Sequence, residues 1–204
     1  MPSIVDFVVA VVLTATVFLP LLTLLHELGH AAVALRVTSG AVHVDIGRPP
    51  ARVRLRVGRL FVTFSPVPPR GVPFAGVCMY QRSSRRPLAE LALLLAGPAM
   101  NALAALALGV LAFSTLHVGP MWLTLTLSSA ALLSLVALLY NIDPRPASRG
   151  ERMRVEVRRD GPKALRCYRV WRAGGIMQLT PRMPAARSEA RSGNPHTPAP
   201  PDQP

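Results

Sequence analysis

Three long apolar segments dominate the pattern of hydrophobic and polar positions along the chain. Residues 1–35 carry only Asp6 and Glu27 as charged side chains, and residues 91–142 contain no Lys, Arg, Asp or Glu. Because a hydrocarbon core requires about 20 apolar residues per helix, the second stretch can hold two membrane spans and the first a third. Pro20 lies inside the first stretch and is expected to kink it. The pattern predicts membrane-spanning helices at about residues 4–36, 88–114 and 121–140.

A different pattern occupies residues 38–84, between the first two predicted spans. Alternating polar and apolar residues, typical of a β-strand with one polar face, run through Arg52, Val53, Arg54, Leu55, Arg56 and Val57. A Val-Gly-Arg turn at 57–59 leads to a second predicted strand at 60–64, and a third is predicted at 41–46. The arginine face is either a solvated or lipid-facing surface, or a strand edge that pairs with an extended substrate segment.

The segment after the third span is basic over residues 141–172 and includes a predicted short helix at 162–172. Residues 173–204 are rich in proline and poor in large apolar residues, so we expect a disordered tail. The predicted fold is therefore a mainly α membrane protein. It has a three-helix transmembrane core, a small β-rich insertion between helices one and two, and a disordered C-terminal tail. Residues 1–172 would form the membrane domain.

Composition and charge placement agree with a membrane protein and exclude a purely soluble one. Hydrophobic residues make up 50% of the chain and charged residues only 16%, against about 25% in a typical soluble domain. The net charge of +13 comes mainly from two arginine-rich blocks, 36–86 and 145–191. Because basic segments stay in the cytosol, we expect an outside N-terminus and a cytosolic C-terminus. The lipid bilayer is a sufficient partner for this charge, and no nucleic-acid partner is expected.

The first predicted span contains a pattern typical of a metal site. His26 and His30 are four residues apart, so their imidazoles share one helix face and can hold one Zn²⁺. Glu27 can then act as general base on a water at the open metal position. The alternative is a polar patch at a helix end, but a carboxylate and two imidazoles are costly in a membrane helix unless they are partnered.

A catalytic zinc site normally has a third protein ligand. The two histidines lie near the predicted cytosolic end of the first span, and the third span ends at Asn141 on the same side. Residues that follow the third span can therefore approach the metal. The candidates there are Asp143 and Asp160.

Three motifs, in this order, resemble those of the site-2 proteases, a family of polytopic membrane zinc metalloproteases that cleave within or beside membrane segments. The zinc motif of the family is matched by Leu25–Ala31, and its G-P-x-x-N element by Gly97–Asn101. Its N-x-x-P element is matched by Asn141–Pro144, and the Asp-Gly pair that follows it by Asp160–Gly161.

The resemblance implies an integral protein of the cell membrane that hydrolyses peptide bonds of membrane protein or peptide substrates, within or near the bilayer. It implies zinc as the cofactor, with His26, His30 and Asp160 as ligands. It also implies Glu27 as the catalytic base. Asparagines of these motifs lie near the catalytic centre in the family, so Asn101 and Asn141 are candidates for binding substrate or supporting the site. Interhelical hydrogen bonding is the other role open to them.

One position departs from the pattern of the family. Where the Asp-Gly pair commonly stands, this chain has Arg149 followed by glycine, and arginine cannot ligate zinc. The pair occurs here after an apparent insertion at 151–159. We favour Asp160 as the ligand because Gly161 follows it and the next residue, a proline, can open a helix with Asp160 near its N-cap. Asp143 stays open as the ligand. So does a catalytically inactive membrane scaffold that binds a protein partner or anionic lipid.

Overall fold

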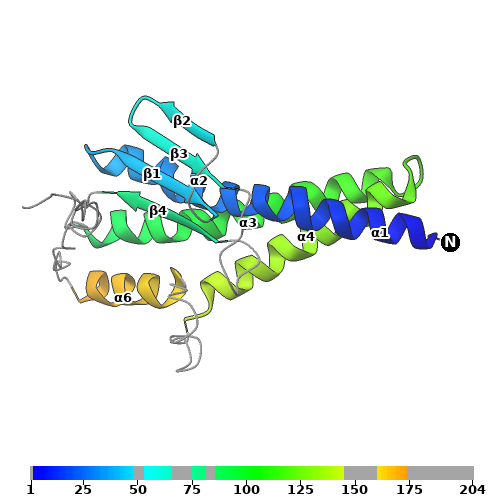
Figure 1. Cartoon of the computed structure of the whole chain (residues 1–204). Coiled ribbons are helices and arrows are strands. Elements are labelled where there is room, and N and C mark those ends of the chain that lie inside the picture. Colours follow the sequence, from blue (N-terminus) through cyan, green and yellow to red (C-terminus); the bar gives the residue numbers. More distant parts are fainter. Residues whose placement is uncertain (1, 48–52, 66–74, 81–85, 145–159, 174–204) are drawn as a thin grey trace, which may run out of the picture.

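A bundle of long apolar helices with a small sheet at one end makes up the described part of the protein (Figure 1). The structure is a computed structural model that describes residues 2–47, 53–65, 75–80, 86–144 and 160–173. Three helical segments are long and apolar enough to cross a membrane: Ile4–Val37, α3 (Pro87–Thr115) and α4 (Met121–Ile142). The three predicted spans are confirmed, with ends close to the expected ones.

The first spanning segment changes its winding just before Pro20. Helix α1 (Ile4–Leu13) continues into a π-helical turn, η1 (Thr14–Phe18), and then into α2 (Leu19–Val37). In a regular α-helix the ring of Pro20 would collide with the carbonyl group four residues earlier. The wider π turn, in which Leu19 donates its N–H to the carbonyl oxygen of Thr14, accommodates that ring. The disturbance expected at this proline therefore takes the form of a π-helical turn.

Helix α3 lies between its neighbours and packs against α2, α4 and α6 (Asp160–Arg172). It crosses α2 so closely at Gly29 that an added Cβ there would lie 2.5 Å from the carbonyl oxygen of Ala96. The hydroxyl of Ser134 on α4 donates a 2.9 Å hydrogen bond to the backbone oxygen of Asn101 on α3. These contacts bring the three motif-bearing helices together.

The insertion between α2 and α3 forms a four-stranded sheet with strand order β2-β3-β1-β4. Its strands are β1 (Val42–Ile46), β2 (Val53–Val57), β3 (Leu60–Phe64) and β4 (Gly76–Tyr80). Strand β1 pairs parallel to β3 and antiparallel to β4, and β2 pairs antiparallel to β3. The three predicted strands correspond to β1, β2 and β3, whereas β4 was not expected from the sequence.

The sheet is held on α2 by an apolar face and by one arginine. Val44 and its alternate neighbours on β1 are buried in one cluster with Ala31 and Ala34 of α2. The guanidinium of Arg59 donates hydrogen bonds to the carbonyl oxygens of Leu35 (2.6 Å) and Thr38 (2.7 Å), at the end of α2. Because Arg59 lies in the turn between β2 and β3, these bonds tie the β2–β3 hairpin to the helix end.

Strand β2 is exposed on both faces, which the alternating sequence pattern does not reveal. Its apolar residues Val53, Leu55 and Val57 are 56%, 57% and 62% exposed, because α2 packs on β1 and not on this outer strand. The arginine-rich strand thus lies exposed at the periphery of the described sheet.

Helix α6 begins at Asp160, slightly earlier than the sequence predicts, and packs on α3 through Ala164 and Cys167. Cys78 and Cys167 are thiols and are not joined by a disulfide. Three features of the sequence interpretation lie outside the described residues: Arg149, the insertion at 151–159, and the predicted disordered tail beyond residue 173.

Candidate metal centre

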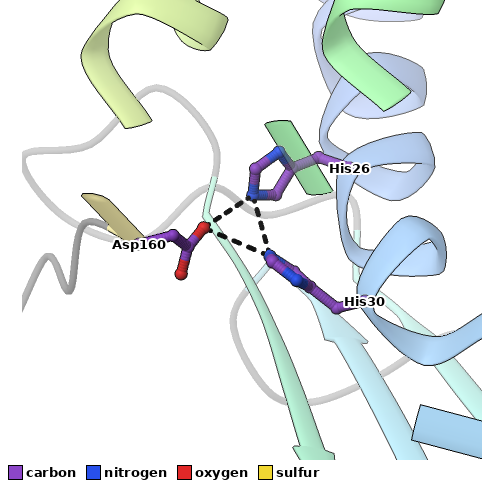
Figure 2. Close-up of side chains that lie close together, drawn as sticks. All are labelled: His26, His30 and Asp160. Atoms are coloured by element: carbon purple, nitrogen blue, oxygen red, sulfur yellow. Dashed lines mark hydrogen bonds and ion pairs between the residues drawn. The ribbon is translucent and has the colours of Figure 1, made fainter. Parts of the chain in front are cut away.

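Three side chains from two helices converge where α2, α3 and α6 meet (Figure 2). The distance between the Nε2 atoms of His26 and His30 is 3.2 Å. Asp160 Oδ2 lies 3.4 Å from Nε2 of His26 and 3.2 Å from Nε2 of His30. The three side chains are only 12%, 8% and 10% exposed, in the order His26, His30 and Asp160. Among the described residues they are the one group of histidine, cysteine and carboxylate side chains with metal-binding spacing.

The backbone of α3 lies directly against the two imidazoles. The contact occurs at Gly97, where an added Cβ would lie 2.8 Å from Cε1 of His26 and would overlap Nε2 of His30. Only a residue without a side chain leaves the imidazoles in this position. The glycine of the G-P-x-x-N element therefore gives the histidines room, which is a structural reason for its place in the motif.

A backbone hydrogen bond sets the orientation of His30. Its Nδ1 lies 2.7 Å from the carbonyl oxygen of Leu93 on α3. A carbonyl oxygen can only accept, so Nδ1 carries the proton, and in a neutral imidazole the lone pair is then on Nε2. This nitrogen faces His26 and Asp160. Outer hydrogen bonds of this kind are typical of metal-binding histidines, whose second nitrogen donates to a carbonyl or carboxylate.

Asp160 reaches the two histidines because the first turn of α6 packs against the end of α4, although the two helices are separated in the sequence. An added Cβ on Gly161 would lie 2.5 Å from the backbone oxygen of Asp143 and 2.6 Å from that of Ile142. The glycine after Asp160 thus permits a backbone contact that a larger residue would prevent. Asp143 itself is the C-cap residue of α4 and is not part of the three-residue group.

The two oxygens of the Asp160 carboxylate have different neighbours. Oδ2 faces the imidazoles, and Oδ1 lies 3.5 Å from Nζ of Lys163, one helical turn further along α6. Burial alone raises the pKa of Asp160, but the adjacent imidazoles and the ammonium of Lys163 outweigh burial and hold this pKa well below its ordinary value. Asp160 is therefore a carboxylate at neutral pH, which is the form that binds a metal.

The geometry and chemistry of the three donor atoms suit zinc. Two bonds of about 2 Å at a tetrahedral angle separate their ligand atoms by about 3.3 Å. The three edges of 3.2, 3.4 and 3.2 Å between the donor atoms are close to that value. Two imidazoles and one carboxylate are also a common ligand set of catalytic zinc, in which a fourth position stays open. Nδ1 of His26 is buried without a hydrogen-bond partner among the described residues.

Glu27 is buried next to this group, at the edge of the sheet. It is 8% exposed, and its carboxylate lies within electrostatic range of His26, His30 and Asp160. It packs against Gly76, the first residue of β4, where an added Cβ would lie 2.5 Å from its Cγ. Of the two outer strands of the described sheet, β4 is thus the one beside Glu27. The arginine-rich β2 forms the opposite edge.

The two asparagines singled out from the sequence lie near the group. Asn101 is 3% exposed and one helical turn after the glycine that contacts the imidazoles. Asn141, near the end of α4, lines a cavity that Asp160 also lines. The sequence interpretation missed three neighbours of the group: the carbonyl of Leu93, the ammonium of Lys163 and the glycine at the start of β4. Only the position of Lys163, three residues after Asp160, could have been noticed in the sequence.

A comparison with curated proteins finds no match to this chain. A comparison with family models finds peptidase family M50, the site-2 protease family, over residues 14–187. The match includes all three motif-bearing helices, the sheet and α6. The apolar spans identify an integral membrane protein, and the family is one of metallopeptidases. By this match over most of its length, the chain belongs to peptidase family M50.

Proposed function

We propose that this chain is an integral-membrane zinc metalloprotease that hydrolyses peptide bonds of membrane-associated substrates within or near the bilayer. The observation that carries the proposal is the triangle of His26 Nε2, His30 Nε2 and Asp160 Oδ2, with edges of 3.2–3.4 Å beside a buried glutamate. Membership of peptidase family M50 supports the same chemistry. One membrane-spanning segment, Ile4–Val37, carries both histidines, so a substrate must reach the site from the bilayer or from its surface.

Each side chain has a distinct role in the proposed reaction. When bound by His26, His30 and Asp160, zinc supplies Lewis-acid polarisation of the scissile carbonyl and acidifies the attacking water. Glu27 accepts the proton of that water during the attack and returns it to the leaving nitrogen. The hydrogen bond between His30 and the Leu93 carbonyl holds the imidazole of His30 in one tautomer and orientation. Burial of these groups limits bulk water and strengthens their electrostatic interactions.

An extended substrate is required, because the backbone groups of a helix are hydrogen-bonded within the helix and hidden from a protease. A segment in extended conformation can add to an open strand edge. The edge beside Glu27 belongs to β4, which favours this strand over β2 as the element that holds the substrate. The arginines of β2 then form a solvated or lipid-facing surface.

A second candidate is a catalytically inactive membrane scaffold that binds a protein partner or anionic lipid. It is favoured by Arg149, which stands where the family commonly has its aspartate. The convergence of Asp160 with both histidines favours the enzyme, because it restores a three-ligand group despite that replacement. Without metal, the same three side chains would form only a buried hydrogen-bond network.

Metal content distinguishes a zinc site from such a network. We expect the purified protein to hold about one zinc per chain, and the double variant His26→Ala/His30→Ala to hold almost none. His43→Ala/His117→Ala is the matched control, because neither histidine belongs to the group. Elemental analysis after dialysis measures the content. Equal zinc in the two double variants would refute the proposed ligands.

The membrane orientation is proposed from the positive charges that flank the spans. An outside N-terminus and a cytosolic C-terminus keep both arginine-rich blocks in the cytosol. We therefore expect a reporter that is fluorescent only in the cytosol to be dark when fused after Pro120 and fluorescent after Arg172. Pro120 precedes α4 and Arg172 ends α6, so the two fusions sample opposite ends of α4. Fluorescence after Pro120 would reverse the proposed topology.

Glu27 is expected to depend on Gly76 for its position. In Gly76→Ala the new Cβ would lie 2.5 Å from Cγ and 3.0 Å from Oε1 of Glu27, so the glutamate or the strand must move. A displacement of about 1 Å can reduce a rate about 100-fold. We expect kcat to fall by about 10- to 100-fold, with zinc retained. Glu27→Asp keeps Cγ but removes the contact with Oε1, so it should relieve part of the clash. The double variant should therefore lose less activity than the product of the two single losses, and strictly multiplicative losses would refute the steric explanation.

A further inference from the structure

A cavity of about 320 Å³ lies beside the three-residue group, between α3, the end of α4 and α6. The polar residues that line it are Asn141, Asp160 and Tyr168. Most of the remaining wall is apolar, and includes Leu91 and Leu95 of α3 and Leu165 of α6. The cavity is therefore a mostly apolar, partly open pocket that touches the candidate metal centre at Asp160.

Helix α6 fixes the cavity relative to that centre. Its first residue, Asp160, lies 3.2 and 3.4 Å from the two imidazole nitrogens. One turn later, Ala164 and Leu165 line the same cavity. Glu27 does not line the cavity and packs instead against the first residue of β4. Asp160 is the member of the three-residue group that lines the cavity, so a group held there would sit on the α6 side of the centre, in contact with Asp160.

The residues that line the cavity determine which kind of substrate side chain it can bind. Among the described residues that line the cavity, Asp160 is the only charged one, and its carboxylate disfavours an acidic occupant. A basic occupant would compete with Lys163 and the imidazoles for the same carboxylate. An apolar side chain needs no hydrogen-bond partner and gains from contact with the leucines. The volume is sufficient for a large side chain such as leucine, methionine or phenylalanine.

We propose that this cavity is a substrate subsite that binds a large apolar side chain next to the scissile bond. The inference rests on the proposed protease function and adds to it a preference for one class of substrate residue. Asp160 both lines the cavity and belongs to the candidate metal centre. A substrate side chain bound in the cavity would therefore help to place the adjacent peptide bond of the substrate at that centre. Removing one methylene from such a contact typically changes selectivity by about 10- to 200-fold.

The test uses membrane-spanning peptides that differ only in the residues flanking one cleavage site, with Gly, Leu, Phe or Asp at each flank. For the reconstituted wild-type protein we expect kcat/KM for Leu or Phe to exceed that for Gly at one flank by at least about 10-fold. In Leu95→Trp, which narrows the cavity, the Phe-to-Gly ratio should fall by at least about 10-fold. Leu103→Trp is the matched control on the same helix, because Leu103 is 59% exposed and does not line the cavity. The Phe-to-Gly ratio of kcat/KM for Leu103→Trp should equal that of the wild type.

Binding provides a measurement that does not depend on turnover. Glu27→Gln protein should bind the Phe peptide more tightly than the Gly peptide, and the additional Leu95→Trp change should remove this difference. A Phe-to-Gly ratio near one at both flanks, or an equal loss for all peptides in Leu95→Trp, overturns the subsite. Occupancy of the cavity by a lipid chain gives this same result. If the wild type holds zinc and binds with the expected preference but never cleaves, the protease proposal fails and the binding subsite stands.

Discussion

The Glu27→Gln variant is expected to retain about one zinc per chain and to lose cleavage of membrane substrates. The amide has nearly the shape of the carboxylate but cannot accept the proton of the attacking water. A positioned general base contributes about 10²- to 10⁴-fold to a rate, so the loss should be at least of this size. Zinc is retained because Glu27 is not one of the three converging side chains. Elemental analysis and cleavage of a reconstituted membrane peptide measure the two properties on one preparation.

The chain provides a close control for this substitution. Glu90 of α3 is also 8% exposed, but it is not part of the group that surrounds the candidate metal. Glu90→Gln therefore removes a buried carboxylate of the same exposure without removing the proposed base. We expect its cleavage rate to stay close to that of the wild type. Full activity of Glu27→Gln with zinc bound would show that another group takes the proton.

Asp160→Ala is expected to weaken zinc binding by more than the roughly 10- to 100-fold that is typical for loss of an outer hydrogen-bond partner. The reason is that Asp160 Oδ2 is one corner of the triangle, 3.2–3.4 Å from both imidazole nitrogens. Asp143→Ala should leave zinc binding unchanged, since this residue caps α4 outside the group. Competition with a chelator measures the affinities. The opposite ranking of the two variants would transfer the ligand role to Asp143, and no effect of either would remove the third ligand altogether.

The membrane spans and the first two members of the site could be predicted because their signals are local. An uncharged stretch long enough to cross a bilayer is visible in the sequence, and the i, i+4 spacing of His26 and His30 defines one helix face. The choice between two aspartates was a different problem. Asp160 reaches the histidines because α6 packs on α3 through Ala164 and Cys167, a tertiary contact that the sequence pattern does not contain.

The sheet is a second part of the structure that the sequence pattern predicts only incompletely. Strands β1, β2 and β3 were predicted, but the residues of β4, Gly-Val-Cys-Met-Tyr, do not alternate between polar and apolar. This segment is a strand because it pairs with β1, and that pairing brings Gly76 against Glu27. The exposure of both faces of β2 also depends on which strand α2 covers. Local pattern thus predicts most of the elements but not β4, and tertiary contacts decide which side chains meet.

The most direct test of the proposed protease is a comparison of membranes from cells that express the wild-type protein or the Glu27→Gln variant at equal levels. Mass spectrometry of protein N-termini in these membranes detects cleavage of any membrane protein, so the substrate need not be chosen in advance. A zinc metalloprotease predicts new N-termini within or beside membrane-spanning segments in the wild type, and their absence in Glu27→Gln. Identical sets of N-termini in both membranes, with zinc bound to both proteins, would contradict the protease and favour the membrane scaffold.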